Sequence, residues 1–205
     1  MKAPVLVIFV VIRLLVCSQE AYVDSLERKR EEHSVMLLET DQLLNEKEQR
    51  GIVRLDYFPV DTTWRIEGKL IKDKGKKFEM PTSTERKPIY RRYGWVCLRH
   101  DGREFRLAVY ENLDLKGKEY KDYLFLPFKD AGAPLTTYGG GRYIELYKPK
   151  TTKSTTIIVD FNTAFNPYCV YSHRFSCPIT PEINHLDFKI PAGEKNPIFL
   201  KTDGQ

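Results

Sequence analysis

The chain has 205 residues, of which 41% are hydrophobic and 30% are charged, and its formal net charge is +5 at pH 7. This length fits one domain plus a leader, and the hydrophobic content is enough to form a core. So high a charged fraction excludes a protein with several membrane spans. The basic residues occur in short, dispersed runs rather than in the stripe typical of nucleic-acid-binding proteins, so no nucleic-acid partner is expected.

Residues 1–16 are predicted to be a signal segment. Lys2 gives a positive start, and residues 3–12 are almost wholly apolar. A run this short does not span a bilayer core of about 30 Å as a helix, but it fits the hydrophobic region of a signal peptide. The pattern therefore predicts that the protein is exported.

The segment Leu14-Leu15-Val16-Cys17 resembles a bacterial lipobox, in which the cysteine is acylated and becomes the N-terminus. Val16 departs from the small residue that such boxes prefer. We expect a lipid on Cys17, which would anchor the protein at the periplasmic face of a bacterial membrane. The alternatives are an uncleaved short anchor and free secretion.

Residues 17–50 are predicted to be a helical segment. From Glu20 to Arg50 the chain lacks Pro and Gly and is rich in strong helix formers. Thr40 and Asp41 are expected to cap a second, shorter helix. A narrow apolar stripe recurs at spacings near three, four or seven, at Tyr22, Leu26, His33, Leu37 and Leu44.

Residues 51–205 are predicted to form the β-barrel domain, because short β-branched and aromatic runs alternate there with turn signals. Asp101-Gly102 lies between two such runs and predicts a hairpin. About eight strands without intervening helices favour a mainly β fold, an antiparallel barrel or sandwich, and we take the barrel. The expected strands are 64–71, 77–80, 93–99, 104–110, 123–128, 142–147, 156–161 and 186–190.

The segment from Tyr138 to Asn184 is the densest in residues suited to binding. Its glycines at 139–141 either shape a turn or let the backbone approach an anion, for which Arg142 is the natural partner. The loop lacks the strand-before, helix-after context of a dinucleotide or phosphate loop. The candidate ligand-binding residues are Tyr138, Gly139, Gly140, Gly141, Arg142, Asp160, Asn162, Asn166, Tyr168 and Asn184.

Cys169 and Cys177 lie in the same segment and have three interpretations. A disulfide is the default in an exported protein. Together with His173 and His185 they could instead offer four ligands to zinc, although the tight Cys-x-x-Cys spacing of common structural sites is missing. Free thiols are the third alternative. Cys97 lies in an alternating run and is expected to be a small core residue.

Several segments taken together resemble the bacterial family catalogued as domain of unknown function 1684, over about residues 20–196. Many members resemble exported lipoproteins, which implies the same for this chain, and the family barrel is similar to flavin-binding split barrels. The segments that carry the resemblance are 55–59, 120–128, 138–143, 160–162, 166–169, 176–178 and 192–195.

The chain departs from the family pattern after the second cysteine. The pattern places a Glu directly before an Asn, whereas Ile183 precedes Asn184 here and Glu182 lies one residue earlier. Either that carboxylate is lost, or Glu182 reaches the same point through a shift in the loop.

Two functions of different classes follow. The first is a non-catalytic cell-envelope protein whose β domain binds a small ligand or an envelope protein, with no cofactor predicted. The second is a hydrolase or flavin-type enzyme with a site around the Gly-rich turn and the Cys loop, for which His173 and His185 are the acid–base candidates. We take binding as the leading hypothesis.

Overall fold

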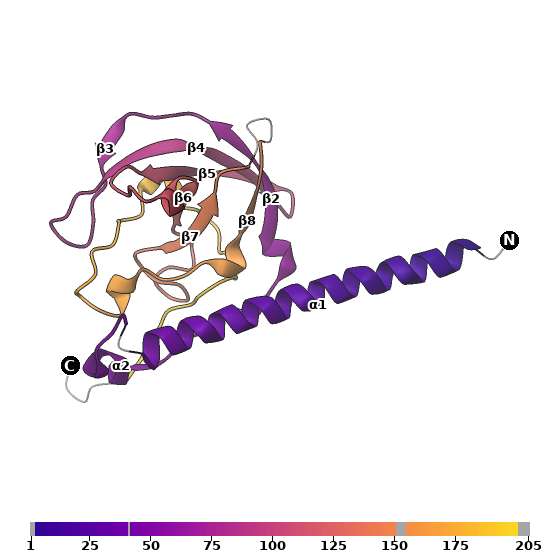
Figure 1. Ribbon diagram of the computed structural model, residues 1–205, viewed down its shortest axis with the longest axis horizontal. Coiled ribbons are helices and arrows are strands. Elements are labelled where there is room, and N and C mark those ends of the chain that lie inside the picture. The colour runs from indigo at the N-terminus through magenta and orange to yellow at the C-terminus, as the bar shows by residue number, and fades with distance from the viewer. Residues whose placement is uncertain (1–2, 41, 151–154, 201–205) are drawn as a thin grey trace.

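The computed structural model describes residues 3–40, 42–150 and 155–200. A curled β-sheet forms the body of the domain, and a long helix runs along one side of it (Figure 1). Both features confirm the predicted mainly β fold with an N-terminal helical segment.

The main sheet is antiparallel and follows the order β7-β6-β5-β4-β2-β8, with β3 paired to β4 off this path. The path starts and ends on β7 and β8, so the sheet curls into half of a barrel. Its strands are β2 (Arg65–Lys72), β3 (Lys77–Glu79), β4 (Ile89–His100), β5 (Arg103–Asn112), β6 (Tyr123–Phe128), β7 (Arg142–Tyr147) and β8 (Thr156–Asp160).

The predicted hairpin joins the two longest strands. His100 of β4 pairs with Arg103 of β5, and the turn residues have positive φ angles of 47° at Asp101 and 77° at Gly102. Two successive left-handed residues form a type I′ turn, whose twist matches that of the flanking strands. Both strands extend beyond the predicted runs, since β4 starts at Ile89 and β5 ends at Asn112.

Hydrophobic cores lie on both faces of the sheet. Successive side chains of a strand point to opposite faces, and β2 accordingly buries Ile66 and Leu70 on the inner face. Met80 and Phe125 belong to the outer core, which the loops around residues 165–178 help to cover. Cys97 was expected in the core but is only half-buried, because its neighbours in β4 face inwards and it does not.

One helix, α1 (Ala3–Leu38), runs through the predicted signal segment and most of the predicted helical segment. Leu26 and Leu37 of the apolar stripe are buried against the domain. The Tyr22 hydroxyl donates a 2.7 Å hydrogen bond to Asp160 at the end of β8. In the described part of the chain, no helix has a stretch long and apolar enough to cross a membrane.

The second helix begins later than the sequence analysis places it. It is α2 (Glu46–Gly51), and Asn45 is its N-cap. The Asn45 side chain accepts from the Glu48 backbone N–H at 3.0 Å, and the Glu48 carboxylate accepts from the Asn45 N–H at 2.9 Å. This capping box satisfies two backbone donors at once. Thr40 instead donates to the Met36 carbonyl of α1, and Asp41 lies outside the described residues.

Two short strands were missed and one predicted strand is wrong. β1 (Ile52–Arg54) pairs with β9 (Ile198–Phe199) and brings the two ends of the domain together. Residues 186–190 are irregular although their side chains alternate between buried and exposed. The Phe188 carbonyl accepts from the Ala131 N–H, and the Ile190 carbonyl accepts from a side chain, so the segment packs as an extended chain without joining a ladder.

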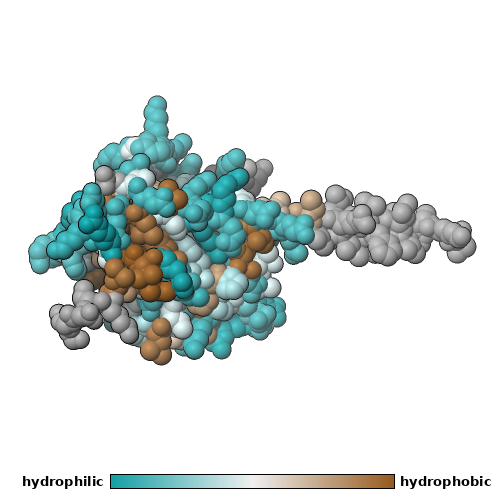
Figure 2. Space-filling model, turned by 90° about the horizontal axis from the view of Figure 1, so that it is seen from below, coloured by the Kyte–Doolittle hydropathy of each residue, from teal (hydrophilic) through white to brown (hydrophobic). Residues whose placement is uncertain are grey.

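The surface on the α1 side is mainly hydrophilic, with separate apolar patches between polar side chains (Figure 2). Large apolar side chains that remain exposed include Val53 and Phe199 on β1 and β9.

Candidate functional site

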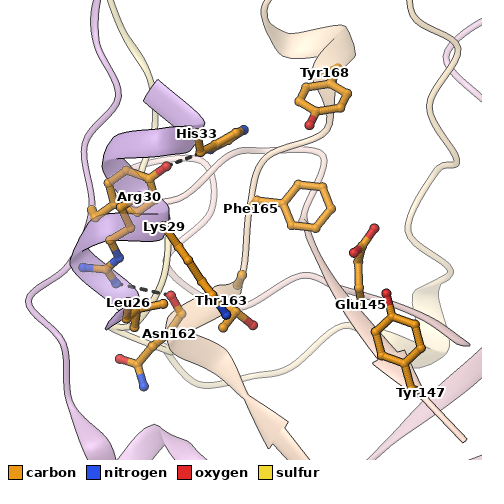
Figure 3. A pocket seen from close by; sticks show the side chains of 12 residues that line it. Leu26, Lys29, Arg30, His33, Glu145, Tyr147, Asn162, Thr163, Phe165 and Tyr168 are labelled. Carbon is orange, nitrogen blue, oxygen red and sulfur yellow. Dashed lines mark hydrogen bonds between the residues drawn. The ribbon is translucent and has the colours of Figure 1, made fainter. Parts of the chain in front are cut away.

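A cleft of about 410 Å³ lies between α1 and the sheet edge formed by β7 and the segment that follows β8. Figure 3 shows its two walls, with the helix on one side and β7 on the other. Aromatic rings and a few polar side chains line it, a composition typical of small-ligand sites.

The α1 wall presents Leu26, Lys29, Arg30 and His33. Residues three and four apart share one face of a helix, so this spacing aims all four at the domain. Lys29 is exposed overall, and its side chain extends into the middle of the cleft (Figure 3).

Arg30 forms the buried part of this wall and is 7% exposed. Its Nη1 donates to the Phe58 carbonyl at 3.0 Å, and its Nη2 donates to the Asn162 carbonyl at 3.2 Å. The guanidinium lies 4.8 Å from the centre of the Tyr57 ring. Its Nε–H has no hydrogen-bond partner among the described residues. An unsatisfied buried donor of this kind costs about 1–3 kcal/mol.

His33 and Tyr57 are a neutral pair beside Arg30. The His33 Nδ1 and the Tyr57 hydroxyl are 2.9 Å apart. Burial lowers the pKa of His33 and raises the pKa of Tyr57, so both groups stay uncharged near neutral pH. The pair therefore supplies hydrogen bonding but no charge to the cleft.

The opposite wall comes from β7 and the loop beyond β8. Glu145 and Tyr147 lie two residues apart and so share one face of β7. Burial raises the pKa of Glu145, and Tyr123 hydrogen-bonds its carboxylate. Phe165 and Tyr168 complete the wall with two more rings, 6.5 Å apart.

Of the ten predicted ligand-binding residues, Asn162 and Tyr168 line this cleft. The structure spreads the others over several places in the domain. Their contacts tie backbone segments together.

Arg142 points into the interior rather than towards a ligand and is 1% exposed. Its Nη2 lies 3.2 Å from the Asp130 carboxylate and donates to the Ile190 carbonyl at 3.0 Å. Its Nη1 donates to the carbonyls of Ala192 and Glu194. Four protein acceptors surround the guanidinium, which fixes the C-terminal segment on β7.

The glycine turn ahead of Arg142 is shaped by close packing. Gly141 has a φ of +91°, and a Cβ on it would lie 2.5 Å from Thr180 Oγ1 and 2.6 Å from the Phe128 carbonyl. The Thr180 hydroxyl donates to the Gly140 carbonyl at 2.9 Å. Only glycine fits this conformation and this space. Tyr138, at the start of the turn, lies near the Cys loop.

Asp160 and Asn162 link β8 to the chain before β2. They flank the start of the short 3₁₀ helix η3 (Phe161–Thr163), and Asp160 Oδ1 accepts from the Asn162 N–H at 3.1 Å. The Asn162 amide bonds both the N–H and the carbonyl of Asp61, at 2.9 and 2.8 Å. Asn162 thus braces the floor of the cleft through its side chain and holds Arg30 through its carbonyl.

Asn166 belongs to a buried polar cluster with Tyr171 and Glu194. Its N–H donates to Glu194 Oε2 at 2.8 Å, and its side chain donates to the Lys195 carbonyl at 2.8 Å. The Tyr171 hydroxyl donates to Glu194 Oε1. Burial raises the pKa of Glu194 to about 7. Glu194 is fully buried and does not line the cleft.

The Asn184 side chain makes hydrogen bonds to the backbones of two strands. Its side chain accepts from the Ala108 N–H at 2.8 Å and donates to the Ala108 and Pro127 carbonyls at 2.8 and 2.6 Å. It therefore bridges β5 and β6 where their ladder opens. Ile183, at the position of the family Glu, is 53% exposed, and Glu182 is exposed as well, so this departure leaves the bridge intact.

Cys169 and Cys177 are neighbouring thiols. The Cys169 N–H donates to the Cys177 sulfur at 3.2 Å. Among the described residues, no three His, Cys, Asp or Glu side chains gather as a metal site. The exposed His185 approaches the Thr180 carbonyl at 3.3 Å, so the four residues of the zinc alternative are not assembled into a site. The disulfide stays a prediction.

Residues 51–195 match the family described as "Protein of unknown function (DUF1684)". The chain belongs to this family. A solution NMR structure of an uncharacterized protein from Haloarcula marismortui is similar to it, with 27% identity and a TM-score of 0.63. That likeness covers 87% of this chain and 96% of the other. No curated protein matches the sequence.

The DUF1684 match begins after α1, so the cleft joins matched residues of the domain to a helix outside the matched range. Sequence reasoning missed Lys29, Arg30 and Glu145 as site residues. The signal that was available is Arg30 itself, a cation between Leu26 and His33 on the apolar stripe of the helix. Nothing in the sequence pairs that stripe with Glu145, which lies more than a hundred residues away.

Proposed function

We propose that this DUF1684 domain is a non-catalytic binding module whose cleft takes a small amphipathic ligand with an anionic group. The observation that carries the proposal is Lys29, whose side chain extends into the cleft beside the buried Arg30 (Figure 3). An anionic oxygen of a ligand can accept a hydrogen bond from its ammonium group.

Charge and shape support the same ligand class. Arg30 Nη1 lies 3.3 Å from the Glu27 carboxylate, so Lys29, which extends into the cleft beside it, is the cation of the α1 wall that faces a ligand (Figure 3). Hydrogen bonds from cations to anionic oxygens are stronger than neutral ones. The rings of Phe165, Tyr168 and Tyr147 line the remaining space and suit an apolar body.

A fluorescent anion tests this proposal directly. 8-Anilinonaphthalene-1-sulfonate combines a sulfonate with an aromatic body and brightens when it is bound. We expect it to bind the full chain in a titration followed by fluorescence. Lys29→Gln should weaken binding about tenfold, because a hydrogen bond to a charged group contributes about 1.5–3 kcal/mol.

Two controls sharpen this titration. Lys69→Gln removes an exposed lysine of β2, outside the cleft lining, and should leave binding unchanged. N-Phenyl-1-naphthylamine keeps the rings but lacks the sulfonate, so Lys29→Gln should not affect its binding. Equal sulfonate affinity in the wild type and in Lys29→Gln would contradict the proposal.

We further propose that the protein is exported and anchored at a membrane by a lipid on Cys17. The short apolar leader and the lipobox-like segment ending at Cys17 support this. Growth of a bacterial host with an alkyne-tagged fatty acid should label the wild type, and Cys17→Ser should abolish labelling. Equal labelling of the two proteins would exclude Cys17 as the attachment site.

A further inference from the structure

Two cysteines of the outer loops are placed to exchange a proton and to form a bond. Cys169 lies in the 3₁₀ helix η4 (Tyr168–Val170), and Cys177 follows after a loop. Both are half-buried. The Cys177 thiol hydrogen-bonds the Cys169 sulfur, and the Cys169 N–H points back at the Cys177 sulfur at 3.2 Å.

The residues around the pair hold Cys177 firmly. Its N–H donates to the Ser83 hydroxyl at 3.1 Å, and its carbonyl accepts from the Ser83 N–H at 2.9 Å. Arg86 donates to the carbonyl of the preceding Ser176 at 2.9 Å. The Ser83 side chain also hydrogen-bonds Cys169. Cys177 is therefore fixed to the segment after β3, while Cys169 is carried by one short turn of helix.

The contact between the sulfurs makes one thiol acidic. A hydrogen bond from Cys177 lowers the pKa of Cys169 to about 6, and His173 adds a smaller effect in the same direction. The pKa of Cys177 is raised, because its S–H is held by the Cys169 sulfur and a second thiolate would form beside the first. One reactive thiolate beside one protonated thiol is the arrangement of an attacking and a resolving cysteine.

We infer that Cys169 and Cys177 form a thiol–disulfide exchange site that small disulfides oxidise, and that oxidation repositions Tyr168 in the cleft. The Cys169 thiolate attacks one sulfur of a low-molecular-weight disulfide, forms a mixed disulfide and releases one thiolate. Cys177 then attacks the Cys169 sulfur, and its proton passes to the departing small thiolate. The bond between the two cysteines forms and the second small thiol leaves, so one disulfide is reduced as one is made.

Oxidation draws the two sulfurs together next to the cleft. A disulfide bond is about 2.05 Å long, which is shorter than any hydrogen bond between sulfurs. Cys177 is fixed, so η4 is the element that gives way, and Tyr168 directly precedes Cys169. The Tyr168 ring lies 5.5 Å from Phe175, 6.2 Å from His33 and 6.5 Å from Phe165, and these contacts change with it.

The test uses the full chain with Cys17→Ser and Cys97→Ser, which leaves only the two thiols in question. Oxidised glutathione should convert it to a species lighter by two hydrogen atoms, as measured by mass spectrometry, and reduced glutathione should reverse this. Adding Cys177→Ser, or Cys177→Ala as a second variant, should trap a glutathione adduct on Cys169. In the chain that keeps both Cys169 and Cys177, Cys169 should react about tenfold faster than Cys97 does in a matched chain that keeps Cys97 alone.

NMR of ring-labelled tyrosine follows the second half of the inference. Signals of Tyr168, assigned with Tyr168→Phe, should shift on oxidation, whereas those of Tyr120 should not. Absence of the disulfide, or a disulfide that reduced glutathione leaves intact, overturns the exchange site. Unchanged Tyr168 signals overturn the link to the cleft. The exchange reaction needs no ligand in the cleft, so its failure leaves the sulfonate titration unaffected.

Discussion

Replacing Arg142 with Met is expected to lower the free energy of unfolding by about 3–5 kcal/mol, the cost of breaking a buried ion pair by removing one partner. The pair with Asp130 is almost fully buried on both sides, with side-chain exposures of 1% and 3%. The substitution leaves the buried Asp130 carboxylate without its counter-ion. It also removes the donor to the carbonyls of Ile190, Ala192 and Glu194. Urea denaturation followed by circular dichroism measures the change.

Two further variants separate the ion pair from general damage. Arg65→Met removes a cation that is 46% exposed and lies 3.9 Å from Asp160, so it should change stability by less than about 1 kcal/mol. Asp130→Asn added to Arg142→Met removes the unpaired charge but keeps an acceptor for the Thr137 hydroxyl, and it should recover part of the loss. If Arg142→Met is no worse than Arg65→Met, Arg142 does not hold the C-terminal segment.

Arg142 also marks the limit of what the sequence could predict. An arginine after three glycines, at the start of a strand, matches an anion-binding loop as well as it matches a buried brace. Asp130 lies twelve residues earlier and the acceptor carbonyls lie about fifty residues later. No local pattern connects these three places, because only the curl of the sheet brings them together.

The strands were predictable where the alternation is local and were missed where pairing joins distant segments. The hairpin at Asp101-Gly102 depends only on the positive φ angles of these two residues, so a local pattern predicts it. The ladder of β1 with β9 connects residues about 145 positions apart, and each strand is too short to show a pattern. Residues 186–190 show the converse error. Their apolar and polar residues alternate as in a strand, yet their backbone groups hydrogen-bond side chains and a loop. The alternation of apolar and polar residues indicates which side chains are buried. It does not indicate which groups hydrogen-bond the backbone.

The walls of the cleft were predictable one by one, but their meeting was not. Spacings of three and four in α1, and of two in β7, indicate which side chains share a face of each element. The meeting of the walls depends on how α1 docks. Tyr22 bonds Asp160, Arg30 bonds the carbonyls of Phe58 and Asn162, and Leu26 is buried between them along the helix. The candidate residues of the Gly-rich and Cys segments were predicted to share one site. They instead lie at several places, and of these Arg142 and Asn166 hold the C-terminal segment around Glu194, which stood out in the sequence only within the resemblance segment 192–195.

Glu194 is expected to make the protein more stable at acidic than at alkaline pH. Burial raises its pKa from an ordinary 4.5 to about 7, so the folded state holds its proton more tightly than the unfolded state. The stabilisation from this proton is complete below the unfolded pKa of 4.5 and is lost as the pH rises through 7. At about 1.4 kcal/mol per pKa unit, the shift from 4.5 to about 7 corresponds to a loss of about 3.5 kcal/mol.

Glu194→Gln isolates this contribution, because glutamine resembles the protonated acid and does not titrate. It keeps an acceptor for the Tyr171 hydroxyl, as the protonated carboxyl does. Urea unfolding at pH 5 and pH 8.5 should show the variant gaining up to about 3 kcal/mol on the wild type over that interval. Glu182→Gln, at an exposed position, should show no such gain. A constant difference between wild type and Glu194→Gln at both pH values would mean that Glu194 is ionised throughout, its charge balanced by Arg142.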